Sequence, residues 1–193
     1  KAIELWQVNI PAGDKEKLAR TLFCFENPPG TKYISGSQDS LGIVLPGLNK
    51  LHYDGGFWPS KIESELRSDI LSWIEKRLWL IPLYPRHNGY DVLSETNITP
   101  QNAQMLSTAA NECWNAIKEK NTQHFGQAIR ESFEAQIAMF PHMVNSDILN
   151  VLNKYKGNAA GWKLSGAGGG GYFIFVSEQP IENALQVRIR QGE

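Results

Sequence analysis

The sequence contains little that would cross-link a fold or hold it in a membrane. It has two cysteines, Cys24 and Cys113, in 193 residues, too few to staple a fold of this size or to form a metal-ligand cluster. We expect both to be free thiols in a reducing, cytoplasmic environment. No apolar run approaches the roughly 20 residues that a transmembrane helix needs, so we expect no membrane partner.

The sequence also lacks an excess of charge of either sign. Its 19 lysines and arginines nearly balance its 20 aspartates and glutamates, for a formal net charge of −1. A protein that binds the phosphate backbone of nucleic acid would carry a basic excess, so no nucleic-acid partner is expected. With 41% hydrophobic residues, the chain can bury the core of one domain or of two small ones.

Apolar periodicity and breaking residues predict short elements in the first half of the chain. Asp14 occupies a helix N-cap position ahead of apolar residues at helical spacing, and the prolines at 28 and 29 end that helix. Glycine and proline divide the stretches that follow. In chain order, we expect a short helix at 37–44, a strand near 50–53, a helix at 64–77 and a buried strand at 78–84.

The second half is predicted to be helical and then rich in strands. Thr99 before Pro100 is a strong helix start, because a hydroxyl cap is followed by proline at the first helical position. The other expected elements are helices at 122–140 and 147–155 and strands at 161–165, 172–176 and 185–189. Helices followed by a strand-rich end indicate an α+β fold.

The run Gly-Ala-Gly-Gly-Gly-Gly at residues 166–171 is the most informative segment. Each glycine in regular structure costs roughly 0.5–1 kcal/mol relative to alanine, so five cost about 3–5 kcal/mol of a total stability of about 5–15 kcal/mol. Such a loop lets backbone amides approach an anion where no Cβ could fit. One alternative is a flexible linker, which the apolar flanking residues disfavour. Another is a tight packing turn without a ligand.

The residues that lead into the loop make the pattern specific. Residues 161–171 read Gly-Trp-Lys-Leu-Ser-Gly-Ala-Gly-Gly-Gly-Gly, which resembles the third motif of the GHMP kinases (galactokinase, homoserine kinase, mevalonate kinase and phosphomevalonate kinase). The resemblance implies that the loop closes over the phosphates of ATP, used with Mg²⁺. It makes Gly166, Gly168, Gly169 and Gly170 the expected ATP-binding residues.

A second segment, Ser-Gly-Ser-Gln-Asp-Ser-Leu-Gly at residues 35–42, is similar to the Gln-Asp segment of the sugar kinases in this family. In that subgroup the aspartate takes the proton from the attacking sugar hydroxyl, or orients that hydroxyl. The resemblance therefore implies that Asp39 is the catalytic base and that Ser37 and Asp39 contact the substrate. A carboxylate so placed supplies about 10²–10⁴ in rate. Taken without the glycine loop, Asp39 would more simply stabilise a helix dipole.

A polar, aromatic loop at residues 84–91 follows the expected buried strand. It contains Arg86, His87 and Tyr90, whose side chains could bind the hydroxyl groups of a sugar. We take Arg86 and Tyr90 as candidate substrate-binding residues. A surface turn with ordinary solvated charges is the alternative.

One signature of the family is absent from the sequence. The segment Pro-x-x-x-Gly-Leu-Gly-Ser-Ser-Ala, which in relatives supplies the main phosphate cradle and a hydroxyl ligand for Mg²⁺, should precede the first helix. The chain therefore resembles the second part of a GHMP catalytic domain, residues 1–96, followed by a complete ferredoxin-like C-terminal domain, residues 97–193. We assign no metal ligand in the chain and expect the ligands of Mg²⁺ mainly from an upstream segment.

The function that the resemblance implies is ATP-dependent phosphorylation of a sugar hydroxyl by a galactokinase-like enzyme. A small-molecule sugar is the expected partner, and the sequence assigns no oligomeric state. A second hypothesis is a non-catalytic sensor of a sugar or nucleotide that keeps the fold, although a sensor has no need of Asp39 as a base. A third is a structural interaction domain, which the cost of the glycine loop disfavours.

We predict that these 193 residues alone are not an active kinase. Phosphoryl transfer needs several anion-stabilising donors and reacting atoms held roughly 3–3.5 Å apart, whereas this chain offers one glycine loop and one candidate base. A coupled ADP-release assay on the purified, monomeric chain should show no sugar-dependent ATP consumption. Turnover of about 1 s⁻¹, roughly the low end for kinases, would show that the absent motif is not needed.

Overall fold

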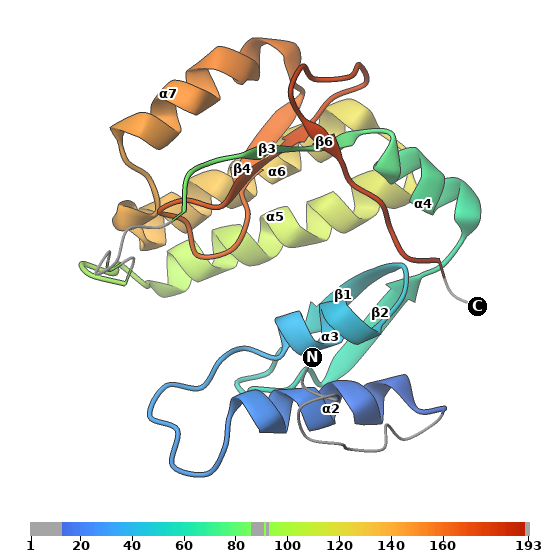
Figure 1. Ribbon diagram of the computed structural model, residues 1–193, viewed down its shortest axis with the longest axis vertical. Coiled ribbons are helices and arrows are strands. Elements are labelled where there is room, and N and C mark those ends of the chain that lie inside the picture. The colour runs from blue at the N-terminus through green and yellow to red at the C-terminus, as the bar shows by residue number, and fades with distance from the viewer. Residues whose placement is uncertain (1–12, 86–90, 92, 192–193) are drawn as a thin grey trace. The chain divides into compact units, whose positions relative to one another are not determined.

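The computed structural model describes residues 13–85, 91 and 93–191, and the chain forms two compact units (Figure 1). The first unit is Lys1–Leu71 with Ile189–Glu193, and the second is Ser72–Arg188. The units divide after Leu71, whereas the sequence predicts a division after residue 96. The strand at 78–82 accounts for the difference, because it pairs with the C-terminal strands. The assignment of 1–96 and 97–193 to two family domains stays a prediction.

The first unit packs two helices against a β-hairpin. Its elements are helix α2 (Lys15–Glu26), helix α3 (Gln38–Val44) and the antiparallel strands β1 (Leu48–His52) and β2 (Lys61–Glu65). Asp14 caps α2 as expected, because its Oδ1 accepts a hydrogen bond from the amide of Lys17 at 3.0 Å. Ala19 of α2 and Leu41 and Val44 of α3 are buried, and Leu51 and Ile62 of the hairpin pack on them.

The helix expected over 64–77 is wrong in its first part. Strand β2 ends at Glu65, and helix α4 (Ser68–Glu75) begins only after a turn. The carboxylate of Glu65, 7% exposed, accepts hydrogen bonds from the backbone amide of Arg67 at 3.0 Å and from its Nη2 at 2.6 Å. This side chain turns the chain from strand into helix. Strand β2 has only Ile62 as an apolar residue, so its sequence gives little sign of a strand.

The second unit is a four-stranded antiparallel sheet with helices packed on it. The strand order is β4-β5-β3-β6, which places the last three strands of the sequence around β3. The strands are β3 (Leu78–Pro82), β4 (Gly161–Leu164), β5 (Tyr172–Val176) and β6 (Leu185–Gln186). The helices are α5 (Pro100–Lys118), α6 (Thr122–Met139) and α7 (Ser146–Tyr155), with short 3₁₀ turns at Pro141–Met143 and Lys156–Asn158.

The sheet and two helices share one hydrophobic core. Phe173 and Phe175 of β5 are fully buried, and they contact Phe133 of α6 and Tyr155 of α7 with ring centroids 5.9 Å apart in both pairs. Helix α5 begins where the sequence predicts, because the Thr99 hydroxyl caps it by accepting a hydrogen bond from the amide of Asn102 at 3.2 Å. The described strands pair antiparallel, and most of the helices are separate from them in the chain, which confirms the α+β fold.

The final strand is shorter than the sequence predicts. The alternation over 185–189 indicates a strand, but β6 covers only Leu185 and Gln186, followed by one further hydrogen bond from the amide of Val187 to the carbonyl of Leu78 at 3.0 Å. From Ile189 the chain belongs to the first unit, where the carbonyl of Arg190 accepts a hydrogen bond from the amide of Gly47 at 2.8 Å. The alternation of apolar side chains therefore extends past the end of strand β6.

Both cysteines are free thiols, as expected, with Cys24 exposed and Cys113 half-buried. Across the described ranges, no helix is both long and apolar enough to cross a membrane.

Helix α6 approaches strand β4 so closely that only glycine fits at the contact. A Cβ on Gly126 would meet the carbonyl carbon and oxygen of Ala160, and a Cβ on Gly161 would lie 2.5 Å from the Cα of Gly126. These are backbone atoms of two packed elements, and they cannot move aside as a flexible side chain could. The contact therefore fixes where α6 crosses the sheet.

We predict that Gly126→Ala lowers the free energy of unfolding by about 1–3 kcal/mol, because overpacking outweighs the roughly 1 kcal/mol that alanine gains inside a helix. Gly157→Ala is the matched control, since no atom lies within 4 Å of the added Cβ, and it should stay within about 0.5 kcal/mol of the parent. Urea unfolding of the chain measures both. Equal midpoints for the two variants would contradict the close approach.

Candidate functional site

The glycine loop joins β4 to β5 and has an unusual backbone. Gly166, Gly168, Gly169, Gly170 and Gly171 all have positive φ, between 70° and 151°. Residues other than glycine rarely adopt such values. The loop is therefore a defined structure that needs its glycines, and the linker alternative does not describe it.

Part of the loop is packed against the protein itself. Gly168, Gly169 and Gly170 are buried, and a Cβ on Gly168 would lie 2.7 Å from the carbonyl oxygen of Met143, just before α7. The amide of Gly169 donates a hydrogen bond to that same oxygen at 2.8 Å. Gly171 pairs with the end of β3, donating to the Tyr84 carbonyl at 3.1 Å. Tight packing, the second alternative, thus explains the crowding at Gly168.

The first turn of the loop is exposed, as is Gly171 at its end. Gly166 and Ala167 are exposed, and their amides make no hydrogen bond to any described residue. Within the loop, the amide of Gly169 is already occupied by Met143. An anion would therefore meet Gly166 and Ala167 first. Ala167 was not among the residues that the sequence singled out, because alanine carries no sign of its backbone role.

Asp39 lies in the first unit, as the second residue of α3. Its side chain is exposed and makes no hydrogen bond or ion pair to a described residue. The carboxylate is thus available both for the expected base role and for the alternative role of stabilising the α3 dipole. The glycine loop lies in the second unit.

Ser37 lies at the N-cap of α3, but its hydroxyl does not cap the helix. The side chain is completely buried; Oγ donates to the carbonyl of Phe57 at 2.7 Å and lies 3.0 Å from the hydroxyl of Tyr53. Its backbone carbonyl accepts a hydrogen bond from Ser40 Oγ at 2.9 Å. A substrate contact by Ser37 stays a prediction and would require this network to open.

The other two substrate candidates, Arg86 and Tyr90, lie outside the described residues, as does His87. Tyr84, two residues before Arg86 in the sequence, is held by a polar contact. Tyr84 donates its hydroxyl to Asn145 Oδ1 at 2.8 Å, and Asn145 also caps α7 by accepting from the amide of Ile148 at 3.0 Å. The end of β3, the glycine loop and the start of α7 are therefore linked.

A half-buried lysine in β4 was missed by sequence reasoning, although a lone cation inside an apolar strand is a recognisable signal. Lys163 Nζ donates to Ser132 Oγ of α6 at 3.2 Å. Burial lowers the pKa of Lys163, and burial raises the pKa of the nearby Cys113 thiol to about 11. The amine therefore carries an energetic cost when it is charged.

The described residues differ in how well they suit the phosphates of ATP and a metal ion. Exposed amides at a glycine-rich turn suit an anion. In the part of the chain that the structure describes, no group of three or more His, Cys, Asp or Glu side chains could hold a metal ion.

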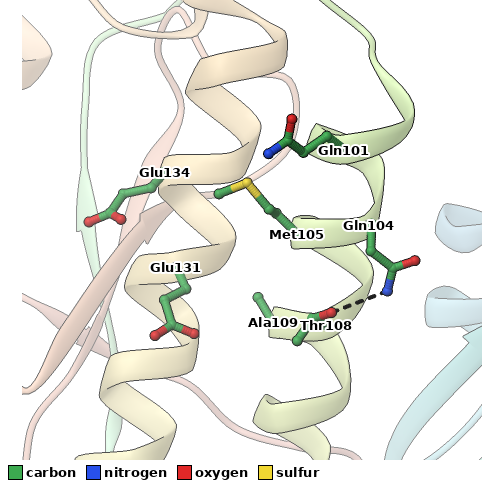
Figure 2. Close-up of a pocket in the computed structure, with 7 residues that line it drawn as sticks. All are labelled: Gln101, Gln104, Met105, Thr108, Ala109, Glu131 and Glu134. Atoms are coloured by element: carbon green, nitrogen blue, oxygen red, sulfur yellow. Dashed lines mark hydrogen bonds between the residues drawn. The ribbon is translucent and has the colours of Figure 1, made fainter.

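A groove of about 340 Å³ between α5 and α6 is unsuited to a nucleotide (Figure 2). Its apolar floor includes Met105 and Ala109, and the carboxylates of Glu131 and Glu134 lie along the α6 side, where they would repel phosphate. Gln104 donates a hydrogen bond to Thr108 at 3.3 Å on the α5 side. The glycine loop contributes no lining residue.

Comparison with known proteins identifies the fold of the chain. No model of a known protein family matches the chain. A heptose kinase structure, D-glycero-D-manno-heptose 1-phosphate kinase from Bacteroides thetaiotaomicron, aligns over 91% of this chain and 48% of its own length, with a TM-score of 0.56 and 16% identity. A mevalonate kinase structure aligns over 91% of this chain and 52% of its own, with a TM-score of 0.60 and 15% identity.

The chain has the GHMP kinase fold. The expectation that rested on the glycine and Gln-Asp segments is thereby confirmed at the level of the fold. A curated relative, the Bacteroides fragilis L-fucokinase/L-fucose-1-P guanylyltransferase, is 23% identical over 198 residues, which cover 92% of this chain and 19% of the relative. The chain thus spans about half of each GHMP kinase structure and a fifth of the curated relative.

Within this GHMP fold, we predict that Gly168→Ala is far more destabilising than Gly166→Ala. Both glycines have positive φ, but only Gly168 would place its Cβ against Met143. Left-handed backbone costs a non-glycine residue about 1–2 kcal/mol, and overpacking adds about 1–3 kcal/mol at Gly168 alone. Thermal and urea unfolding of the two variants measure the difference, and equal losses would contradict the packing of the loop on Met143.

We also predict that Lys163→Met stabilises the second unit at pH 7, because the methionine keeps the apolar stem and removes the buried ammonium. The pKa of Lys163 is lowered on folding, so between the folded value and about 10.4 the unfolded chain binds more protons and the parent gains stability as the pH rises. The advantage of the variant should shrink over that range in urea unfolding at several pH values.

Lys76→Met, at an exposed lysine of the same unit, is the control for Lys163→Met. It should change the unfolding midpoint little and equally at each pH. A Lys163→Met variant that is less stable than the parent at pH 7 would mean that the bond to Ser132 outweighs the cost of burial.

Proposed function

We propose that this chain is part of a kinase that transfers the γ-phosphoryl group of ATP to a hydroxyl group of a sugar. The observation that carries the proposal is the GHMP kinase fold over 91% of the chain, together with an exposed aspartate in the Gln-Asp segment. Because the chain spans about half of the aligned structures, the activity is proposed for the full-length protein.

In this proposal, Asp39 is the base. The exposed carboxylate accepts a hydrogen bond from the sugar hydroxyl and takes its proton as the oxygen attacks the γ-phosphorus. The new oxygen–phosphorus bond forms while the bond from the γ-phosphorus to the bridging oxygen breaks, and ADP leaves. Most of the catalysis in phosphoryl transfer is positioning and charge stabilisation, so the carboxylate acts chiefly by orienting the hydroxyl and accepting its proton.

The glycine loop is proposed to bind the phosphates of ATP by its exposed turn. The amides of Gly166 and Ala167 are the donors that the loop leaves open to an anion, and its buried half keeps that turn in place through the contacts with Met143. Preorganised donors lose little free energy on binding because they are already oriented. Mg²⁺ would supply charge neutralisation between the phosphates, and no ligand for it is proposed from this chain.

The substrate is proposed to be a monosaccharide or its phosphate. The curated relative is named as an L-fucokinase and one aligned structure as a heptose 1-phosphate kinase, while the Gln-Asp segment resembles that of galactokinase-like enzymes. A panel of L-fucose, D-galactose and D-glycero-D-manno-heptose 1-phosphate, assayed with ATP on the full-length protein, distinguishes them. Phosphate transfer to none of these would count against the proposal.

A second candidate is a non-catalytic sensor of a sugar or nucleotide. One observation favours it: the amide of buried Gly169 donates to the carbonyl of Met143, so the loop has a structural role that does not require turnover. A sensor would bind the sugar panel or ATP and transfer no phosphate. The exposed Asp39 then has no chemical role beyond the helix dipole.

We predict that Asp39→Asn in the full-length protein lowers turnover by about 10²–10⁴, because the shape is kept and the basicity is lost. Sugar affinity, measured by isothermal titration, should stay within a few fold of the parent. Turnover within roughly threefold of the parent would rule out the base role.

Asp147→Asn is the matched control for Asp39→Asn. Asp147 is also the exposed second residue of a helix, α7, so its amide variant loses a similar interaction with a helix dipole, about 0.3–1 kcal/mol. It should leave turnover within twofold of the parent. In terms of the activation free energy, that is well below the roughly 1.4 kcal/mol that changes a rate tenfold. Equal losses in both variants would favour the dipole interpretation of Asp39.

A further inference from the structure

The loop between β1 and β2 is tied to the end of α3 that carries Asp39. At its base, the amide of Ser60 donates to the carbonyl of His52 at 2.8 Å and closes the hairpin. Further along the loop, Ser37 at the N-cap of α3 binds both Tyr53 and Phe57 through its Oγ. The loop is therefore held in place before any ligand binds.

The direction of these hydrogen bonds follows from the chemistry of the hydroxyl groups. Ser37 has one hydroxyl proton, and it is donated to the carbonyl of Phe57 at 2.7 Å. Since that proton is used, the contact of 3.0 Å between Ser37 and Tyr53 requires Tyr53 to be the donor. The phenolic oxygen of Tyr53 is then left with lone pairs only, and it can accept a hydrogen bond from a ligand hydroxyl but cannot donate one.

Two aromatic side chains of this loop are exposed although Ser37 holds both residues, Tyr53 by its hydroxyl and Phe57 by its carbonyl. Tyr53 is 45% exposed and Phe57 is 59% exposed. The neighbouring Trp58 differs, because its ring packs under the guanidinium of Arg20 at 4.5 Å and edge-on to Phe23 of α2. Packing in the first unit thus explains the position of the Trp58 ring, but it does not explain why the rings of Tyr53 and Phe57 are aromatic and exposed.

We propose that Tyr53 and Phe57 bind the sugar beside Asp39. The Tyr53 oxygen accepts a hydrogen bond from a sugar hydroxyl, and the Phe57 ring covers an apolar face of the sugar. Aromatic surface with a few fixed polar groups is typical of small-molecule sites. The inference rests on the proposed function for the identity of the ligand, and it makes Ser37 a positioning residue that acts through Tyr53 and Phe57.

The burial of Ser37 supports this division of roles. Its side chain has 0% exposure, so a direct contact with a substrate would require the loop to leave α3. Tyr53 instead is 45% exposed, and its hydroxyl belongs to the same network. The sequence singled out Ser37 by its place in the Gln-Asp segment, whereas Tyr53 lies 16 residues away in the chain and joins it only in the fold.

Tyr53→Phe in the full-length protein tests the hydrogen bond, with L-fucose, D-galactose and D-glycero-D-manno-heptose 1-phosphate as probes. A neutral hydrogen bond contributes about 0.5–1.5 kcal/mol, so the variant should bind the preferred probe about 2- to 13-fold more weakly by isothermal titration. In the kinase assay, KM for the sugar should rise by the same factor while kcat and KM for ATP stay within twofold of the parent, a change of under about 0.5 kcal/mol. Phe57→Ala should weaken binding about tenfold or more by loss of the ring.

Tyr33→Phe is the matched control, because Tyr33 is also in the first unit, is 78% exposed and has no hydrogen bond to Ser37. It should bind the probes as the parent does. Equal effects of Tyr53→Phe and Tyr33→Phe would overturn the inference, even where the parent is an active kinase. Ser37→Ala should raise KM for the sugar as Tyr53→Phe does, and a fall in kcat alone would overturn its positioning role.

The outcomes separate this inference from the proposed function. If the parent binds a probe and transfers no phosphate, a weaker Tyr53→Phe variant still supports the sugar-binding role while the kinase proposal fails. If the parent binds none of the probes, both fail. A third outcome is that Tyr53→Phe and Phe57→Ala leave sugar binding unchanged but weaken the binding of a protein partner. The two rings would then be a protein-docking surface, and the inference would be overturned.

Discussion

The architecture of the second unit depends on the packing of the glycine loop against Met143. At this point the β4–β5 hairpin, the end of β3 and the start of α7 meet through backbone hydrogen bonds from Gly169 to Met143 and from Gly171 to Tyr84. A side chain at residue 168 would separate them, because its Cβ would lie 2.7 Å from a carbonyl oxygen. The glycines thus allow three elements to share one junction, and the same junction holds the exposed turn of the loop in place.

Local signals in the sequence were sufficient for most of the helices. Asp14 and Thr99 cap helices where expected, because a cap depends only on residues three positions apart. Strand β2 was not predictable in this way. Its five residues are mostly polar, and they form a strand because they pair with β1, from which they are separated by a loop. The division of the chain after Leu71 likewise depends on pairing between β3 and β5, about ninety residues apart in sequence.

The candidate site shows the same contrast between local and distant information. The Gln-Asp and glycine segments were recognisable as continuous motifs, and the fold that they implied was confirmed. The environment of each residue was not predictable, since burial of Ser37 depends on Phe57 and Tyr53, and the lowered pKa of Lys163 depends on elements packed around β4. A motif therefore identifies the backbone that a family shares, while contacts made across the fold decide which side chains reach a ligand.

The cost of five glycines in one loop does not by itself require a ligand. Crowding against Met143 accounts for Gly168, and pairing with β3 accounts for Gly171, so these residues would be needed in a purely structural turn. Gly166 and Gly171 are both exposed, with no atom within 4 Å of the ideal Cβ, but only Gly171 has its amide paired. The Gly166 amide makes no hydrogen bond to a described residue, and its φ of 70° is one that asparagine tolerates. Packing leaves that residue unexplained. The argument for a bound anion therefore rests on the open turn at Gly166 and Ala167 rather than on the number of glycines.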